Sequence, residues 1–415
     1  MLSDIGLTLD PLLPVQRDAV TCDREPLLVL GAAGTGKTRT LEGRFLWFVE
    51  QGCRPEQVLL LTPSDARADA TRARLERGLE GGYDELFVTS PVELAGLILG
   101  AAGPGVDPLE PVLGPAERFA MLLERIDQLS IERHDFGGSA HALLAGFIRR
   151  IDRLKAHLVG AEDYARWAES LAESESEAEL EREFAEVYRV HEQMLAEAGA
   201  RDAGDLIRDA LRVVRERPAA AERFEHVLLD DAHDLDLASA TLSREVAGTR
   251  LTAAADPSRG GRGASREGFA HVITLDYSLR LPRRILRAAS GAVTCSCEPT
   301  TAEGEVAFWR CSNERAQAQS AAADIERLVV TEGVSPGQIA VLVPAISREG
   351  QAVAVALEER AVAYRVVGET AFFRRAEIRD VLAWLRLLAD PTDAAAVVRA
   401  LARPPVELRS VDIAR

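Results

Sequence analysis

Aromatic residues, lysines and long apolar runs are all scarce in this chain. Aromatic side chains make up 5% of the 415 residues, and the 49 basic residues include only two lysines, Lys37 and Lys155. No apolar run approaches the roughly 20 residues that a membrane-spanning helix needs. The beginning of the chain lacks the basic segment that opens a secretory signal. These absences argue against a membrane or exported protein, and we expect this one in the cytoplasm.

Cysteine offers no recognisable metal site. The five cysteines are Cys22, Cys53, Cys295, Cys297 and Cys311, and no histidine or further cysteine stands near the 295–297 pair at ligand spacing. We interpret them as buried or incidental thiols, which suits a reducing compartment.

Negative charges exceed positive charges by 17, which argues against an indiscriminate nucleic-acid binder because phosphate affinity comes largely from Lys and Arg. Much of the acid lies in residues 169–183, which we interpret as a solvated helix face. A local basic groove therefore stays compatible with the net charge. The length predicts about two to four domains, each with its own core.

The most informative segment is GAAGTGKT at residues 31–38, directly after the apolar run 27–30. A G-x-x-x-x-G-K-T sequence behind a buried strand is typical of a loop that holds nucleotide phosphates. Its glycines let backbone N–H groups face the phosphate oxygens, and the following helix adds its positive end. Lys37 is expected at the β- and γ-phosphates and Thr38 at Mg²⁺. The predicted ATP-binding residues of this loop are Gly31, Ala32, Ala33, Gly34, Thr35, Gly36, Lys37, Thr38 and Arg39.

An acidic strand end provides the second half of such a site. Residues 226–231 read HVLLDD, an apolar run that ends in two carboxylates. A phosphate loop needs an acid at the tip of a neighbouring strand to hold Mg²⁺. Asp230 is the predicted metal ligand together with Thr38, and Asp231 is predicted to orient or deprotonate the attacking water.

Short apolar runs separated by helical periodicity predict a parallel α/β sheet at the start of the chain, with strands at 27–30, 58–62 and 86–90. Residues 117–217 have helical periodicity throughout, and residues 226–234 return to a strand. A helical block between two strands of one sheet predicts an inserted subdomain.

A second α/β pattern begins after Ser290. Its predicted strands are residues 305–311, 339–344 and 364–368, and helices lie between them. Residues 376–415 are predicted to be mainly helical.

Further segments occur in a recognisable order around the nucleotide site. They are LLPVQRDAV at 12–20, VLLLTPSDARADATRARL at 58–75, DDAHD at 230–234 and LDYSLRLPRRIL at 275–286. In this order they resemble the motifs of the UvrD/Rep/PcrA-like superfamily 1A DNA helicases. Residues 334–390, especially YRVVGETAFFRRAEIRDVLAWLRLLAD, resemble the start of that family's second motor lobe. The resemblance covers essentially the whole chain.

The resemblance implies roles for individual residues. Gln16 takes the place of the glutamine that recognises adenine, and Arg280 that of an arginine supplied to the γ-phosphate. The implied catalytic residues are Lys37, Asp231 and Arg280. Contact with single-stranded DNA is implied at Thr62, Ser64 and Thr89.

The implied fold is α/β, a RecA-like P-loop lobe with an inserted all-helical subdomain, followed by part of a second RecA-like lobe. The first lobe is expected at residues 1–104 and 216–285, and its helical insertion at 105–215. The second lobe is expected to start at 286–390, and a second helical insertion, truncated, at 391–415.

The resemblance also implies ATP and Mg²⁺ as cofactors and single-stranded DNA, or a junction of single and double strands, as partner. A membrane is not implied. ATP hydrolysis between the lobes is expected to move the protein along DNA with 3′-to-5′ polarity, in repair or recombination.

Several positions depart from the family pattern. Asp231 stands for a glutamate, which retracts the carboxylate by roughly 1.5 Å, and misplacements near 1 Å can cost about 100-fold in rate. His233 stands for a glutamine and Pro63 for an aromatic residue, and Val92 lies where a histidine is expected. Residues 254–264 lack the family's glutamine and its base-stacking aromatic. Losing stacking platforms, each worth about 1–3 kcal/mol per base, predicts impaired stepping.

Two later motifs of the family do not occur before Arg415: a T-x-H-x-x-K-G-like stretch and a terminal arginine motif. We expect a fragment of a longer protein or a truncated reading frame, because half a lobe leaves a sheet edge exposed.

Two other functions stay open. A degenerate motor would serve as a DNA- or partner-binding scaffold, like the weaker motor subunit of AdnAB-type helicase–nucleases, with a second helicase or nuclease subunit as partner. A P-loop ATPase without a nucleic-acid role is favoured only by the net charge. The basic cluster Arg283, Arg284 and Arg287 fits a DNA contact and a solvated or acid-paired face equally well.

Overall fold

Two compact units, Met1–Val306 and Ala307–Arg415, divide the chain in the computed structural model. The structure describes residues 12–79, 81–101, 111–134, 140–172, 177–220, 222–259, 266–290, 298–344, 346–366 and 376–389, together with 397, 400, 401 and 406.

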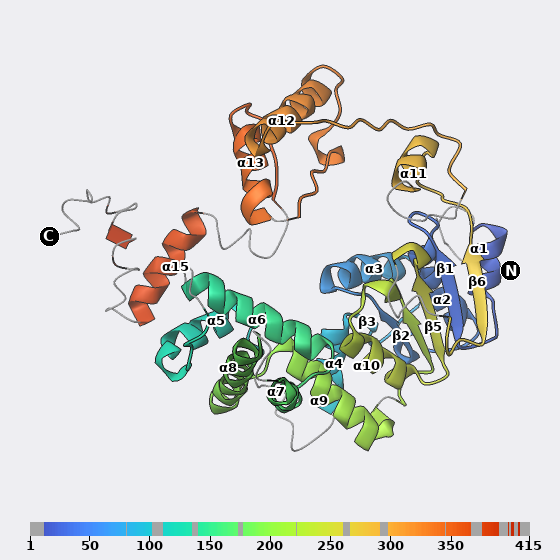
Figure 1. Cartoon of the computed structure of the whole chain (residues 1–415). Helices are drawn as coiled ribbons and strands as arrows, with labels where there is room; N and C mark the ends of the chain where they lie inside the picture. Colours follow the sequence, from blue (N-terminus) through green and yellow to red (C-terminus); the bar gives the residue numbers. More distant parts are fainter. Residues whose placement is uncertain are drawn as a thin grey trace. The chain divides into compact units, whose positions relative to one another are not determined.

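A six-stranded, all-parallel sheet organises the first unit, in the order β3-β2-β4-β5-β1-β6 (Figure 1). The strands are β1 Leu27–Gly31, β2 Val58–Leu61, β3 Val88–Thr89, β4 His226–Leu229, β5 Leu251–Ala255 and β6 His271–Leu275. The predicted parallel α/β sheet is therefore confirmed. β3 is shorter than predicted, and β5 and β6 were not predicted as strands. β5 reads LTAAA, in which alanine gives little strand signal.

Both faces of this sheet are buried. Along β1, Leu28 and Leu30 enter one apolar core, while Leu27 and Val29 enter the other. The first core is completed by α4 Pro91–Ala101, α9 Ala203–Glu216 and α10 Leu237–Ala247, and the second by α1 Pro14–Val20, α2 Lys37–Glu50 and α3 Asp65–Gly78. Strands covered on both faces read as continuous apolar runs rather than alternating ones, which explains the LLVL and VLLL sequences.

Between β3 and β4 the described residues form a helical block with its own core. Its helices are α5 Pro115–Glu124, α6 Ala140–Ala156, α7 Ala161–Ser170 and α8 Ala178–Glu197. Phe147, Phe184 and Tyr188 lie at the centre of that core. The next helix, α9, has strong amphipathic character and packs its apolar face on the sheet. The predicted bounds of the insertion, 105–215, stay a prediction.

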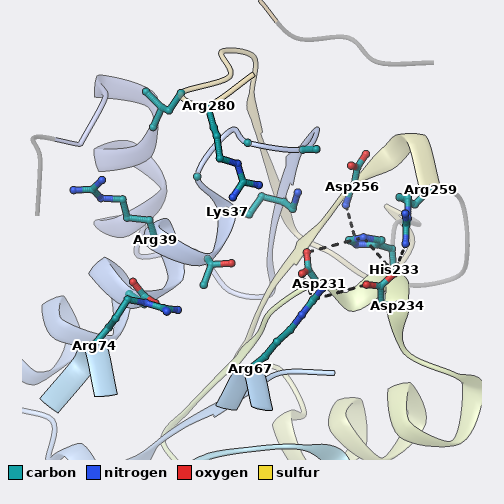
Figure 2. A pocket seen from close by; sticks show the side chains of 16 residues that line it. Lys37, Arg39, Arg67, Arg74, Asp231, His233, Asp234, Asp256, Arg259 and Arg280 are labelled. Carbon is teal, nitrogen blue, oxygen red and sulfur yellow. Dashed lines mark hydrogen bonds and ion pairs between the residues drawn. The ribbon is translucent and has the colours of Figure 1, made fainter. Parts of the chain in front are cut away.

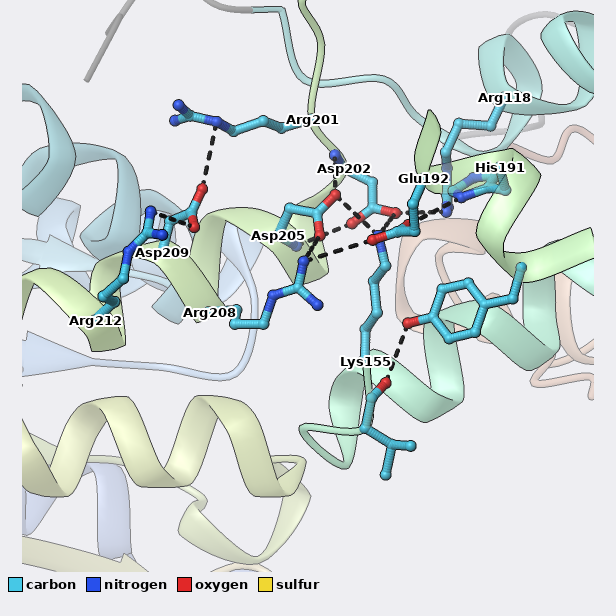
Figure 3. A network of polar contacts seen from close by, with 12 residues as sticks. Arg118, Lys155, His191, Glu192, Arg201, Asp202, Asp205, Arg208, Asp209 and Arg212 are labelled. Atoms are coloured by element: carbon cyan, nitrogen blue, oxygen red, sulfur yellow. Dashed lines mark hydrogen bonds and ion pairs between the residues drawn. The ribbon is translucent and has the colours of Figure 1, made fainter. Parts of the chain in front are cut away.

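A buried ionic network joins this block to α9 (Figure 3). The Lys155 ammonium donates to Asp202 Oδ2 at 2.8 Å and Asp205 Oδ2 at 2.9 Å, and lies 2.6 Å from Glu192 Oε1. Arg118 also binds Asp202, at 3.0 Å. Burial alone would lower the pKa of Lys155, but the neighbouring carboxylates outweigh it and raise that pKa. The one lysine outside the phosphate loop is therefore a charged tie between α6, α8 and α9.

The second unit contains the helices α12 Glu314–Val330, α13 Gln351–Glu358 and α15 Ala376–Ala389. α12 and α13 pack through Ala318, Ala322, Ala356 and Leu357. The helices predicted in this region are confirmed where the structure describes the residues. Most of residues 390–415 lie outside the described part of the chain.

The strands predicted in the second unit are wrong for the described residues. Residues 305–311, 339–344 and 364–366 form no strand, while 367 and 368 lie outside the described part. Their apolar side chains are not covered, since Phe308 is 86% exposed and Leu342 is 93% exposed. A strand is stable only when a neighbour pairs its backbone groups, and these segments pair with nothing in the described ranges.

Cys22, Cys53 and Cys311 are free thiols, while Cys295 and Cys297 lie outside the described residues. Among the helices that the structure describes, none combines the length and the apolar character needed to cross a bilayer.

Replacement of Lys155 by alanine is expected to destabilise the first unit by about 3–5 kcal/mol, because removing one partner of a buried ionic network leaves uncompensated charge. Thermal and urea unfolding measure this change. The control is Arg212→Ala, which removes an ion pair to Asp209 from a side chain that is 64% exposed. A Lys155→Ala loss no larger than the control's would contradict a structural role for the network.

Candidate functional site

The phosphate loop follows β1 and turns at two glycines with left-handed backbones, Gly34 (φ +79°) and Gly36 (φ +87°). A Cβ at Gly36 would lie 2.4 Å from Gln16 Nε2. Both this close contact and the left-handed backbone therefore exclude a side chain at Gly36. The loop borders a cavity of about 640 Å³. The loop, the helix α2 that starts at Lys37, and the ends of β4 and β5 contribute to its walls.

Lys37 lies over the loop and is largely buried. Its ammonium donates to the carbonyl oxygens of Gly31 at 2.9 Å and Ala32 at 3.2 Å. These two contacts hold the charge at the mouth of the loop, where a phosphate oxygen is a stronger partner than a neutral carbonyl. Contact between Lys37 and a phosphate stays a prediction.

A hydrogen bond connects the loop to the acidic strand end. The Thr38 hydroxyl donates to Asp230 Oδ2 at 2.6 Å, although the two residues are 192 positions apart. Asp230 is buried, and among the described residues no cation lies within ion-pair distance of it. Burial and then the charge of Asp231 raise the pKa of Asp230 to about 6. A buried carboxylate beside a hydroxyl, without its own cation, fits the oxygen ligands that Mg²⁺ prefers.

Asp231 begins the turn after β4 in a left-handed conformation, with φ 43° and ψ 46°. Aspartate tolerates this region better than most residues. Its backbone N–H donates to Asp230 Oδ1 at 3.0 Å, and its side chain lines the cavity. The turn therefore aims two consecutive carboxylates differently, one at Thr38 and one into the cavity.

His233 links this turn to the end of β5. Its Nδ1 accepts from the Asp256 backbone N–H at 3.1 Å. Burial lowers the pKa of His233, so the neutral ring carries its proton on Nε2. That nitrogen lies 3.6 Å from Asp234 Oδ1 and 4.0 Å from Asp231 Oδ1. The histidine thus presents a donor to the cavity, as the family's glutamine amide would.

Arg280 is held beside the loop by its neighbour. The Leu279 N–H donates to the Gly34 carbonyl at 2.9 Å, and both Leu279 and Arg280 line the cavity. Figure 2 shows the Arg280 side chain extending toward Lys37 from the opposite side of the cavity to Asp231. The structure therefore brings together Lys37, Asp231 and Arg280, the three predicted catalytic residues.

Gln16 lies behind the loop. Its Oε1 accepts from the Leu13 N–H, and its Nε2 donates to the Thr35 carbonyl, both at 2.9 Å. Its side chain is buried and does not line the cavity. In this structure Gln16 braces the loop, and its contact with adenine stays a prediction.

Six charged residues of the cavity wall were not predicted as site residues: Glu42, Arg67, Arg74, Asp234, Asp256 and Arg259. Arg74 Nε lies 2.7 Å from the buried Glu42, and Arg259 pairs with Asp234 at 3.1 Å. Arg67 and Arg74 are seven positions apart on α3, a spacing that places both on one helix face. That spacing is the signal from which these two arginines were predictable.

The implied DNA-contact residues lie at the ends of β2 and β3. Thr62 and Thr89 are buried, and the Thr62 hydroxyl donates to the Ser64 carbonyl at 2.9 Å. Ser64 is exposed at the start of α3. DNA contact at these three positions stays a prediction.

The basic cluster at the start of α11 Arg283–Ser290 is acid-paired in part. Arg283 and Arg284 lie 3.5 Å and 3.7 Å from carboxylate oxygens of Glu303. The acid-paired alternative is therefore observed for these two arginines.

Taken together, these contacts form an anion site beside an oxygen-ligand pair. Loop N–H groups, Lys37 and Arg280 offer positive charge, while Thr38 and Asp230 offer oxygen ligands. This arrangement can hold a nucleoside triphosphate with Mg²⁺, and Asp231 is close enough to line the same cavity.

Comparison with known families agrees with this site. Residues 12–259 match the UvrD/REP helicase N-terminal domain, and residues 279–413 match the UvrD-like helicase C-terminal domain. The family resemblance predicted from the motifs is thereby confirmed.

Individual relatives are similar at low identity. PcrA, an ATP-dependent DNA helicase of Bacillus subtilis (strain 168), is 24% identical over 414 residues, covering 93% of this chain and 54% of the relative. UvrD1, an ATP-dependent DNA helicase of Mycobacterium leprae (strain TN), is 28% identical over 449 residues, covering 97% of this chain and 55% of the relative. DNA helicase II of Escherichia coli (strain K12) is 24% identical over 445 residues, covering 99% of this chain and 59% of the relative. The chain therefore spans little more than half the length of these relatives.

The affinity for Mg²⁺-AMPPNP is expected to fall as the pH drops through about 6, the raised pKa of Asp230. A protonated carboxyl no longer suits a metal, and each further pH unit leaves about tenfold less carboxylate. Calorimetric titration across this range measures the change. Asp230→Asn is the control, with weak binding and no such pH step. A step that persists in Asp230→Asn would assign the titration to another group.

Gln16→Ala is expected to weaken AMPPNP and GMPPNP binding alike, by about fivefold, since a lost hydrogen-bond brace is worth about 1 kcal/mol. The brace acts on the loop and not on the base. Equilibrium binding of both analogues, with exposed Gln51→Ala as the matched control, measures it. A loss confined to the adenine analogue would instead assign Gln16 to the base.

Proposed function

The chain belongs to the UvrD/REP helicase family, and from this premise we propose that it binds and hydrolyses ATP with Mg²⁺ to drive movement on single-stranded DNA. The observation that carries the proposal is the hydrogen bond from Thr38 to the buried Asp230, beside a phosphate loop with Lys37 in place. This bond supports the proposal because it joins the two halves of the proposed phosphoryl-transfer site, which are 192 positions apart in the sequence.

In the proposed reaction the protein acts mainly by positioning and charge. Loop N–H groups and Lys37 bind the phosphate oxygens, and Arg280 adds positive charge from the far wall of the cavity. Asp231 accepts a hydrogen bond from the attacking water and orients it. Mg²⁺, when bound by Thr38 and Asp230, neutralises charge on the phosphates.

The proposed substrate is single-stranded DNA or a junction of single and double strands, with 3′-to-5′ polarity and a role in repair or recombination. Support comes from the family and from the names of the relatives, which are DNA helicases. Because the chain spans little more than half of those relatives, unwinding by this chain alone is part of the proposal.

A scaffold function is the second candidate, and one observation favours it. The proposed water-orienting residue is an aspartate, and its carboxylate is paired with Arg67. A shorter side chain whose oxygen is already engaged is poorly placed to orient water. The proposed partner of such a scaffold is a second helicase or nuclease subunit.

ATP turnover with and without single-stranded DNA tests the first proposal. DNA is expected to stimulate turnover, and Lys37→Ala to lower it about 100-fold or more, since a lost transition-state cation costs that much. Turnover equal to that of Lys37→Ala in both conditions would reject the motor and leave the scaffold.

Asp231→Glu is expected to raise turnover, by up to about 100-fold, because it restores the carboxylate reach that the family uses. Steady-state kinetics measures it, and Asp69→Glu on the exposed face of α3 is the matched control. A decrease in Asp231→Glu would show that the cavity is fitted to the shorter acid.

A further inference from the structure

Arg67 occupies a position that the proposed chemistry does not use. It lies in the first turn of α3, and its guanidinium Nη1 binds Asp231 Oδ2 directly. The same nitrogen is 3.8 Å from Asp234 Oδ2. Figure 2 shows Arg67 reaching from α3 across the floor of the cavity to this acidic turn.

Asp231 is the main partner of Arg67 in this turn. Asp234 has a closer cation in Arg259, at 3.1 Å. The second oxygen of Asp231 is 4.0 Å from His233 Nε2, which is too long for a hydrogen bond. Among the described residues, Arg67 therefore makes the only direct hydrogen bond to the Asp231 carboxylate.

This contact opposes the proposed role of Asp231. A carboxylate oxygen that already accepts from a guanidinium is less available to a water molecule. Asp231 is then held in place with one of its two oxygens engaged, so full access of water to the carboxylate requires Arg67 to leave.

The contact is also suited to being broken. The Arg67 side chain is 50% exposed, and Asp231 is 20% exposed. Exposed ion pairs are worth only about two- to fivefold in an equilibrium constant. Arg67 meets Asp231 through one nitrogen and one oxygen, whereas a phosphate group can bind the guanidinium through two parallel N–H bonds.

α3 places Arg67 where phosphates are expected from two sources. The helix starts directly after Thr62, Pro63 and Ser64, the segment whose resemblance implies DNA contact, and its first turn lines the nucleotide cavity. Resting on the proposed function, we propose that Arg67 is a positioning residue. It holds Asp231 through its guanidinium until a phosphate group draws it off, which frees Asp231 to orient water.

Competition for Arg67 has a consequence that binding alone can measure. If phosphate and Asp231 compete, removing the Asp231 charge must tighten phosphate binding through Arg67, by thermodynamic reciprocity. Asp231→Asn is a suitable variant because asparagine also adopts the left-handed backbone found there.

The experiment is a double-mutant cycle on the whole chain, with wild type, Asp231→Asn, Arg67→Ala and the double variant. One arm measures binding of a fluorescein-labelled oligothymidylate without nucleotide. The other measures binding of Mg²⁺-AMPPNP without DNA. Thermal unfolding of each variant checks that the fold is kept.

The expected result is that Asp231→Asn tightens binding about two- to fivefold more when Arg67 is present than when it is alanine. Such coupling in the DNA arm identifies the DNA backbone as the source of the phosphate, and coupling in the nucleotide arm identifies the nucleotide. Arg67→Lys is expected to keep part of the coupling, because it keeps the charge but not the fork. Arg77→Ala, on the exposed last turn of α3, is expected to show no coupling with Asp231→Asn.

Equal effects of Asp231→Asn in both Arg67 backgrounds and in both arms would overturn the inference while the proposed function stands. The proposed function can also fail while the inference stands. Both arms measure binding and not turnover, so coupling supports the inference even if the chain hydrolyses no ATP. Failure of every variant to bind either probe would overturn both.

Discussion

The common direction of the strands is the constraint on which the site depends. Because the sheet is all-parallel, the loops after β1, β2, β4, β5 and β6 leave it at one edge. Those loops bring the phosphate loop, Arg67, Asp230, Asp256 and Arg280 to that edge. The two buried faces supply the rigidity, since apolar side chains alternate between the two cores and leave the strands no freedom to slip.

The second property of the site is that positive and negative side chains lie close together but have different kinds of partner. Two cations of the cavity wall bind oxygens of the protein, Lys37 the loop carbonyls and Arg67 Asp231. Asp230 instead stays buried, supported by the Thr38 hydroxyl and the Asp231 N–H, and burial raises its pKa. A bound phosphate with its metal suits both groups, so nucleotide binding and the restraint on Asp231 follow from the same distribution of charge.

The parts that were predictable are those in which neighbouring residues determine the structure. The loop at Gly31 to Thr38 has its glycines, lysine and threonine within one turn, and the HVLLDD strand end needs only its own pattern. The strands at 305–311 and 339–344 failed because an apolar run becomes a strand only when a partner pairs with it, and no described residue does. β5 was not predicted, for the opposite reason. Its alanines give little strand signal, but its neighbours β1 and β4 pair with it in the sheet.

The sequence by itself determined the family, the phosphate loop, the acidic strand end and the helical character of residues 140–156 and 178–197, because periodicity and motif spacing are local properties. Only the tertiary structure decided that Gln16 braces the loop, that His233 accepts from the Asp256 backbone, and that Arg67 binds Asp231. Arg67 and Asp231 are 164 positions apart. Their contact depends on which strand ends meet at the sheet edge and on which charged partner each side chain finds there. The local spacing of residues in the sequence predicts neither of these.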